Sequence, residues 1–156
     1  MTVKAIPEGY HSLTIYLSIA EAAQAIDFYR RAFDAVEESR LDGPGGMVAH
    51  AELRIGDTRL MLSQPCSQGP LGTLQPDSLP PFGLHLYVED VDARFQQAVD
   101  AGATVVNPVS NQFYGDRTGT LKDPFGQLWF MATHVEDLTP EQIRVRAEEM
   151  FRQPQA

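Results

Sequence analysis

The chain has 156 residues, of which 43% are hydrophobic and 21% charged, a composition typical of one globular domain. Twelve basic residues against 21 acidic ones give a net charge of −9. This charge disfavours partnership with nucleic acid or an anionic membrane, because both attract positive surfaces. The single cysteine, Cys66, excludes an intrachain disulfide and a cysteine metal cluster. We expect a cytoplasmic protein, since no signal peptide and no run of about 18 apolar residues is present.

The first part of the chain, about 10–63, predicts a βαβββ module. Apolar and polar residues alternate over 13–19, which indicates a half-buried strand. Helical spacing follows over 21–33. Strands are then predicted over 35–41, 48–55 and 59–63.

After a proline-rich linker over 64–82, the pattern repeats over about 83–134. A strand over 84–88 leads to a helix that Asp90 can cap and Gly102 can end. Strands are predicted over 103–108, 118–122 and 128–133, the last two joined by an Asp-Pro-Phe-Gly turn at 123–126. A final amphipathic helix over about 139–152 begins with a capping box of Thr139 and Gln142. We expect this helix to cover a sheet edge or a partner subunit.

The two halves end in similar hairpins. Leu121 precedes Gly126 and the apolar residues 128–130, much as Leu53 precedes Gly56 and the apolar residues 60–62. A duplicated module of this kind usually builds one site between its halves. The predicted fold class is therefore α+β, with tandem βαβββ modules and a C-terminal helix.

Several short motifs, in this order and at this spacing, resemble the vicinal oxygen chelate superfamily. Within it they are most similar to the PhnB-like glyoxalase/bleomycin-resistance/dioxygenase subfamily. The motifs occupy residues 10–11, 25–29, 53–57, 87–92, 114–117 and 132–134. The resemblance covers nearly all of residues 1–156 as a single domain. It implies curled mixed sheets around a cavity, a small-molecule ligand and a homodimer, because the superfamily commonly completes its cavities across a two-fold axis.

The resemblance and the strand alternation together select the residues that line the cavity. Leu13, Ile15, Leu17 and Ile19 should pack under the helix, so the intervening residues face inward, and a slip of one residue would invert the assignment. The expected ligand-binding residues are Tyr16, His50, Glu52, Met61, His85, Tyr87, Tyr114, Arg117 and Phe130. Tyr114 is placed by the family's loop, and Arg117 could hold a carboxylate or phosphonate. The candidate catalytic groups are His50, Glu52 and His85, since an imidazole beside a carboxylate can act as a general base.

Metal-dependent members of the superfamily carry His, Glu or Gln at four inward positions. The matching residues here are Thr14, Met61, Gly83 and Phe130, which cannot hold a divalent ion. We therefore expect no metal and no other cofactor. The alternative is a displaced metal site formed by the three candidate catalytic groups. We expect His11 and His134 at surface positions, and Cys66 as an ordinary thiol.

Three functions remain open at this point. The first is a metal-free protein that binds a small molecule unchanged, and the second is a metal-dependent or acid–base lyase, isomerase or dioxygenase. The third is the same fold with an unassigned physiological ligand. In a purely structural interpretation, the loop over 114–117 is a turn in which Asp116 accepts backbone hydrogen bonds and Arg117 pairs with a carboxylate. Trp129 is predicted in the core.

Overall fold

The computed structural model describes residues 3–153 and contains two βαβββ modules. The first module consists of β1 (Ile15–Ser18), α1 (Ala22–Phe33), β2 (Val36–Asp42), a short 3-10 turn (Pro44–Gly46), β3 (Val48–Ile55) and β4 (Thr58–Ser63). The second consists of β5 (Gly83–Tyr87), α2 (Val91–Ala101), β6 (Thr104–Asn111), β7 (Asp116–Lys122) and β8 (Leu128–His134). The last element is α3 (Pro140–Arg152).

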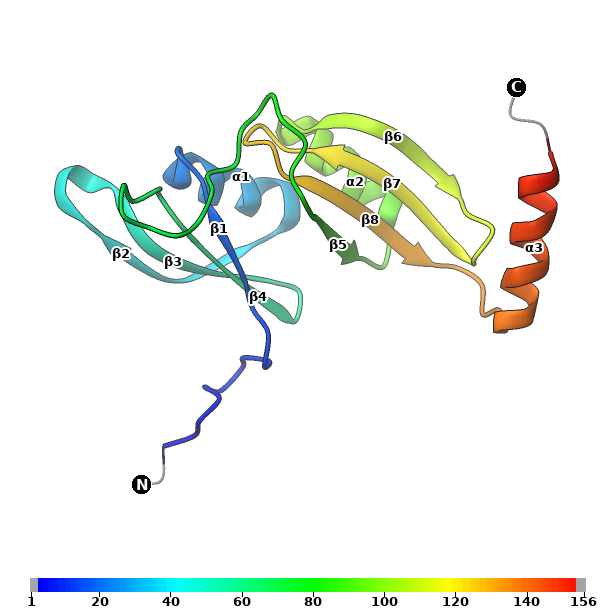
Figure 1. Cartoon of the computed structure of the whole chain (residues 1–156), viewed down its shortest axis with the longest axis horizontal. Coiled ribbons are helices and arrows are strands. Elements are labelled where there is room, and N and C mark those ends of the chain that lie inside the picture. Colours follow the sequence, from blue (N-terminus) through cyan, green and yellow to red (C-terminus); the bar gives the residue numbers. More distant parts are fainter. Residues whose placement is uncertain (1–2, 154–156) are drawn as a thin grey trace.

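Each module forms its own four-stranded mixed sheet, and the two sheets have the same topology (Figure 1). The strand orders are β1-β4-β3-β2 and β5-β8-β7-β6, with the first strand of each module parallel to the last. Both sheets are open, with β1 and β2 at the edges of one and β5 and β6 at the edges of the other. The α+β fold and the duplicated module predicted from the sequence are therefore confirmed.

One face of each sheet is covered by a helix, and the core lies there. In the first module, buried side chains of α1 pack on alternate residues such as Leu53 and Leu62. In the second, Phe95 and Ala98 of α2 pack toward Leu121 and the other buried residues of the sheet. Trp129, at 2% exposure, lies in this core as predicted. Among residues 3–153, no helix covers the other face of either sheet.

The two modules are joined through their helices, which lie side by side behind the sheets (Figure 1). Arg31 on α1 donates a hydrogen bond to the Ala101 carbonyl at the end of α2, 3.1 Å away. In return, the amide of Gln97 on α2 donates to the Arg31 carbonyl and to Asp34. These polar contacts flank the apolar contact between the helices and fix how the modules sit against each other.

A buried carboxylate adds a second link between the modules. Asp123, in the turn between β7 and β8, accepts hydrogen bonds from the Tyr29 hydroxyl of α1 at 2.8 Å and from the Trp129 indole at 3.0 Å. Its other oxygen accepts the backbone N–H groups of Phe125 and Gln127. Burial raises the pKa of Asp123, although all four hydrogen bonds favour its ionised form. The predicted Asp-Pro-Phe-Gly turn is thus also an inter-module contact.

The linker over 64–82 contains no helix or strand but is fastened at its centre. Leu74 donates its backbone N–H to the Ser18 carbonyl, 2.9 Å away, and packs against the core. Gly126 lies against the Gln75 carbonyl, where an added Cβ would stand 2.3 Å from the oxygen. The linker therefore contacts both modules near its midpoint.

The terminal helix α3 stands apart from both sheets (Figure 1). Its capping box of Thr139 and Gln142 is formed as predicted, and Arg146 pairs with Glu136. None of its residues is buried, so α3 does not cover a sheet edge, one of the two roles expected for it. Over residues 3–153, no helix is long and apolar enough to cross a lipid bilayer.

One predicted core residue is placed wrongly by the alternation. Leu13 was expected under the first helix, but it precedes β1 and is 86% exposed. Leu17 and Ile19 are buried as predicted, and Ile15 is half-buried against the core. The strand that α1 covers is therefore shorter than the apolar pattern.

Candidate functional site

We call the uncovered face of the first sheet the first open face. It carries a row of polar side chains together with one methionine. Tyr16 on β1 is paired with Met61 on β4, and Met61 is paired with Glu52 on β3. Paired residues of adjacent strands point to the same face, and the residues between them, such as Leu62, are buried beneath the helix. His50 lies two residues from Glu52 and shares this face. The structure thus places four of the expected site residues together.

A hydrogen-bonded chain runs across the first open face. The Tyr16 hydroxyl lies 2.8 Å from Nδ1 of His50, and Nε2 of His50 lies 3.3 Å from Oε1 of Glu52. The neighbouring Tyr10 hydroxyl contributes most to holding the pKa of Glu52 below its ordinary value, and His50 and Ser39 add to the effect. Glu52 is therefore an ionised acceptor, so the His50 Nε2 atom must carry a hydrogen.

Tyr10 lies beside Glu52 at the first open face. Its ring lies 5.0 Å from the guanidinium of Arg59, a cation–π contact, and Arg59 also pairs with Glu38. Burial, followed by the Glu52 carboxylate, raises the pKa of Tyr10 to about 12. The phenol is thus neutral at physiological pH. Sequence reasoning used Tyr10 only as part of a family motif and did not place it at the site.

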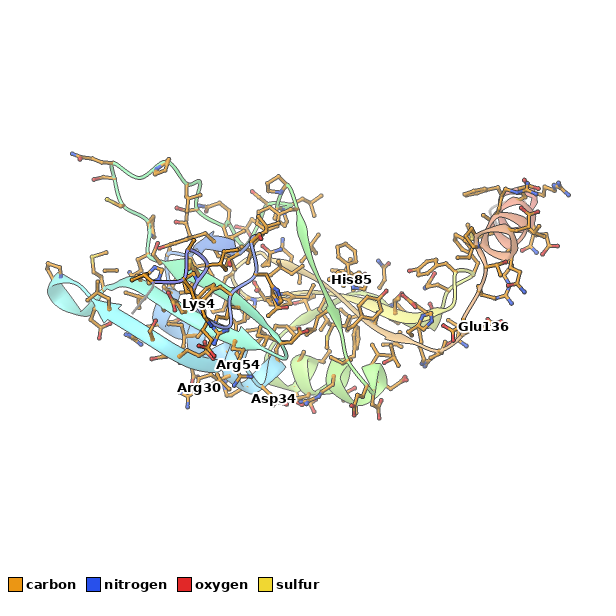
Figure 2. All side chains as sticks on the ribbon, turned by 90° about the horizontal axis from the view of Figure 1, so that it is seen from below. Lys4, Arg30, Asp34, Arg54, His85 and Glu136 are labelled. Atoms are coloured by element: carbon orange, nitrogen blue, oxygen red, sulfur yellow. The ribbon has the colours of Figure 1, made fainter. Side chains whose placement is uncertain are left out.

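The uncovered face of the second sheet, which we call the second open face, presents a row of rings. His85 on β5 is paired with Phe130 on β8, and their rings are 6.5 Å apart at an interplanar angle of 18°. The ring of Tyr87 is 4.7 Å from that of His85. Phe130 leans over Gly83, where an added Cβ would stand 2.2 Å from the ring. Figure 2 shows His85 on the side of the sheet opposite α2.

A buried aspartate supports this row from the end of β7. Asp116 is 4% exposed, and it accepts hydrogen bonds from the Tyr87 hydroxyl at 2.6 Å and from Nδ1 of His134 at 2.7 Å. Burial opposes its ionisation, but these two hydrogen bonds outweigh burial and hold the pKa of Asp116 below its usual value. His134 also contacts Asp137 at 2.9 Å, and both carboxylates raise the pKa of the imidazole.

Sequence reasoning missed the roles of Asp116 and His134. Asp116 accepts side-chain donors instead of the backbone hydrogen bonds expected of it, because β7 already begins at this residue. His134 is half exposed, as a surface residue would be, yet it is fixed between two carboxylates. Asp116 and His134 are directly paired across β7 and β8. Continuing the alternation from Phe130 by two steps would have identified His134.

Two further expected site residues lie in different places. Tyr114 is partly exposed and lies close enough to Tyr87 to raise the pKa of that phenol slightly, so it borders the second open face. Arg117 points to the helix side of the sheet, where it forms a bidentate pair with Asp92 at 2.7 Å for each contact. The structure therefore corrects Arg117 from a ligand-binding residue to a partner of Asp92.

Within one chain, the expected lining residues are divided between the two open faces. Among residues 3–153, no hydrogen bond connects the contacts of Tyr16, His50 and Glu52 with those of Tyr87, Asp116 and His134. A cavity of about 300 Å³ between the linker and β1 includes Tyr16. Another of about 480 Å³ between the modules includes His85 and Tyr87 at its margin. Neither cavity contains residues from both sets.

The residues at the family's metal positions do not fit a divalent ion. The Phe130 ring fills the space over Gly83, Met61 offers only a thioether, and Thr14 precedes β1. His50 and Glu52 lie on the first sheet and His85 on the second, so one chain does not assemble the alternative triad. Throughout the described part of the chain, no three His, Cys, Asp or Glu side chains are grouped so that they could share one ion.

Two βαβββ modules joined through their helices, with unclosed mixed sheets, define the glyoxalase class of α+β proteins. The chain belongs to the Glyoxalase/Bleomycin resistance protein/Dioxygenase superfamily, which it matches over residues 11–131. A relative from Mycobacterium bovis, Mb0911c, is 44% identical over 136 residues, covering 85% of this chain and 90% of that protein.

Solved structures agree with this assignment at the level of the fold. TioX from Micromonospora sp. ML1 has a TM-score of 0.63 and 23% identity, covering 83% of this chain and 100% of that chain. A PhnB protein from Bacillus cereus has a TM-score of 0.60 and 22% identity, covering 79% of this chain and 99% of that chain. The resemblance to the superfamily inferred from the motifs is confirmed.

Proposed function

We propose that this protein binds a small molecule, without a metal, in a cavity formed by the first open face of one subunit and the second open face of a second copy. One observation carries the proposal. Four aromatic side chains stay substantially exposed around the two hydrogen-bonded clusters: Tyr16 at 36%, Tyr87 at 60%, Tyr114 at 37% and Phe130 at 38%. Exposed aromatic patches bordered by polar groups are characteristic of ligand sites and interfaces.

The unpaired strands at the sheet edges support a homodimer. β1 and β5 each end a sheet, and their outer edges lack a strand partner among the described residues. Exposed edges are ordinarily covered in a folded protein. A two-fold axis would place each first open face against its partner's second open face, with the same surface used on both chains. The dimers common in the superfamily fit this arrangement.

Light scattering at micromolar concentration tests the assembly. The chain mass is 17.3 kDa, and we expect about twice that value for the particle in solution. A charge placed on the second open face by Phe130→Glu should shift the particle toward the monomer. Asp100→Lys, on the outer surface of α2, is the matched control and should leave the mass unchanged. A wild-type protein of monomer mass would contradict the dimeric cavity.

An acid–base lyase or isomerase is the second candidate, because the structure does join His50 to Glu52 and Tyr16 in one chain of contacts. An imidazole held by a carboxylate can serve as a general base near neutral pH. Metal analysis of the purified protein, together with turnover assays, separates the candidates. A stoichiometric divalent ion that disappears in both His50→Ala and Glu52→Ala would favour the metal-dependent enzyme over the binding protein.

A further inference from the structure

The hydrogen-bond direction at Tyr87 restricts the chemistry of the ligand. A phenol has one hydrogen, and Tyr87 donates it to Oδ2 of Asp116 at 2.6 Å. Asp116 itself is buried, and its other oxygen is occupied by His134. The exposed parts of this cluster are the His134 ring, whose two nitrogens already contact Asp116 and Asp137, and the Tyr87 oxygen, which can only accept a hydrogen bond. Because the Tyr87 hydroxyl donates to the Asp116 carboxylate, the negative charge of Asp116 increases the partial negative charge on the Tyr87 oxygen.

The first open face has the same polarity. With one hydrogen on the His50 ring, Nε2 donates to Glu52 and Nδ1 accepts from Tyr16. The Tyr16 oxygen is then left as an acceptor at the surface, again in front of an ionised carboxylate. The basic groups beside the two clusters are themselves paired with carboxylates: Arg59 with Glu38, and Arg117 with Asp92 on the opposite side of its sheet. His134 is held between Asp116 and Asp137, so this group of three carries more acidic than basic side chains. Lys122, also on the second open face, stands at the other end of β7 from Asp116.

The ring row of the second open face adds a requirement of shape. The ring of Phe130, from β8, and those of His85 and Tyr87, from β5, form one row with centroid separations of 6.5 and 4.7 Å. Such a row offers stacking contacts to a flat ligand, which add about 0.5–1.5 kcal/mol per ring pair in proteins. Gly83 makes the row possible, since a side chain there would displace Phe130.

We infer that the ligand is a planar aromatic cation that stacks on the row of Phe130, His85 and Tyr87 and donates N–H groups to the Tyr87 and Tyr16 oxygens. This inference rests on the proposed function for the meeting of the two open faces. Acceptor-only phenols with carboxylates behind them favour a positively charged donor and disfavour an anion. The aromatic row selects a flat body over an aliphatic amine.

Two tricyclic probes of similar size test the ligand class. Proflavine is a planar cation with N–H donors, and anthracene-2-carboxylate is a planar anion without them. Binding is measured by fluorescence titration and calorimetry at 0.15 M salt, where long-range attraction to the acidic protein is screened. We expect saturable binding of proflavine and at least tenfold weaker binding of the anion.

Variants assign the binding to the proposed groups. Tyr87→Phe keeps the ring and removes the acceptor, and should weaken proflavine binding about tenfold. Phe130→Leu should weaken it about fivefold through lost stacking. Asp116→Asn should also weaken it, whereas Asp100→Asn, an equal charge change on the outer surface of α2, should have no effect. Equal binding of the two probes, unsaturable binding of proflavine, or an unchanged affinity in Tyr87→Phe would each overturn the inference.

Light scattering on the same samples separates this inference from the proposed function. A dimer that fails to bind proflavine overturns the ligand class and leaves the dimeric cavity in place. A monomer whose proflavine affinity still falls in Tyr87→Phe overturns the dimeric cavity and supports the ligand class.

Discussion

The Tyr29 hydroxyl of the first module donates a hydrogen bond to the Asp123 carboxylate of the second, 2.8 Å away and out of contact with water. Tyr29 is fully buried, and its pKa is raised well above the usual value by burial and by Asp123. The phenol therefore remains a donor at any physiological pH. Both oxygens of the Asp123 carboxylate accept hydrogen bonds.

Removing either partner should destabilise the whole chain. We expect Tyr29→Phe to lower the free energy of unfolding by about 1–2 kcal/mol, because one buried hydrogen bond to a charged group is lost. Asp123→Asn should cost about 1–3 kcal/mol, since its NH2 group must face donors on one side. Urea unfolding at pH 7 measures both changes. Tyr16→Phe on the first open face is the control and should stay within about 0.5 kcal/mol of wild type.

His134 should make stability depend on pH near neutrality. Its folded pKa is raised above the usual 6.5 by Asp116 and Asp137, so the folded state holds the proton more tightly than the unfolded state. The resulting stability is fully present below the unfolded pKa and is lost as pH rises through the folded pKa. We expect thermal unfolding of wild type to shift to lower temperature across this window. His134→Gln should lack that shift, and an NMR titration of the imidazole should give a lower pKa in Asp116→Asn.

Two glycines of the second sheet offer a matched pair of substitutions. An added Cβ would meet the Phe130 ring at Gly83 and the Phe95 ring at Gly119. Phe130 is 38% exposed and can move, so Gly83→Ala should change stability by less than about 1 kcal/mol while shifting the NMR signals of His85. Phe95 is enclosed, so Gly119→Ala should cost about 1–3 kcal/mol through overpacking. Equal costs at both sites would contradict the mobility of Phe130.

Amide hydrogen exchange should divide the linker into three parts. Leu74 is tied to Ser18 and Gln75 lies against Gly126, so exchange should be slow around 73–76. The flanking residues 66–72 and 77–81 form few backbone hydrogen bonds and should exchange fastest among internal segments. Protection over 66–72 equal to that of β5 would refute this expectation.

Local patterns were sufficient to predict the modules. The Asp90 side chain accepts from the Ala93 N–H at the start of α2, and Gly102 ends that helix with a positive φ, as their residue types indicate. The pattern failed at Leu13, where apolar alternation continues beyond the strand. Ile15 already pairs with Leu60 near the hairpin, so Leu13 lies past the part of the sheet that α1 covers and borders the cavity between the modules.

The site could be predicted only within each sheet. Alternation of side chains along each strand predicts that Tyr16 and Glu52 share one face of the first sheet. This prediction depends only on the pairing of neighbouring strands. How this face is oriented relative to the one with His85 within one chain depends on the packing of α1 against α2, and no pattern within a strand encodes that packing. The prediction for Arg117 was wrong because its motif was taken as a loop, in which alternation cannot assign a side chain to a face. Strand β7 begins at Asp116, so the next residue, Arg117, points to the helix side of the sheet.

The Asp123 contacts help set the angle between the two open faces within one chain. A rotation of one module relative to the other would break the buried hydrogen bonds that Asp123 accepts from Tyr29 and Trp129. In the proposed dimer, the width of the shared cavity would therefore be governed by the core of each chain and only secondarily by the contact between the two copies. If the proposed cavity binds a ligand, substitutions around this turn and along the contact between α1 and α2 should change the ligand size it accepts without altering the open faces.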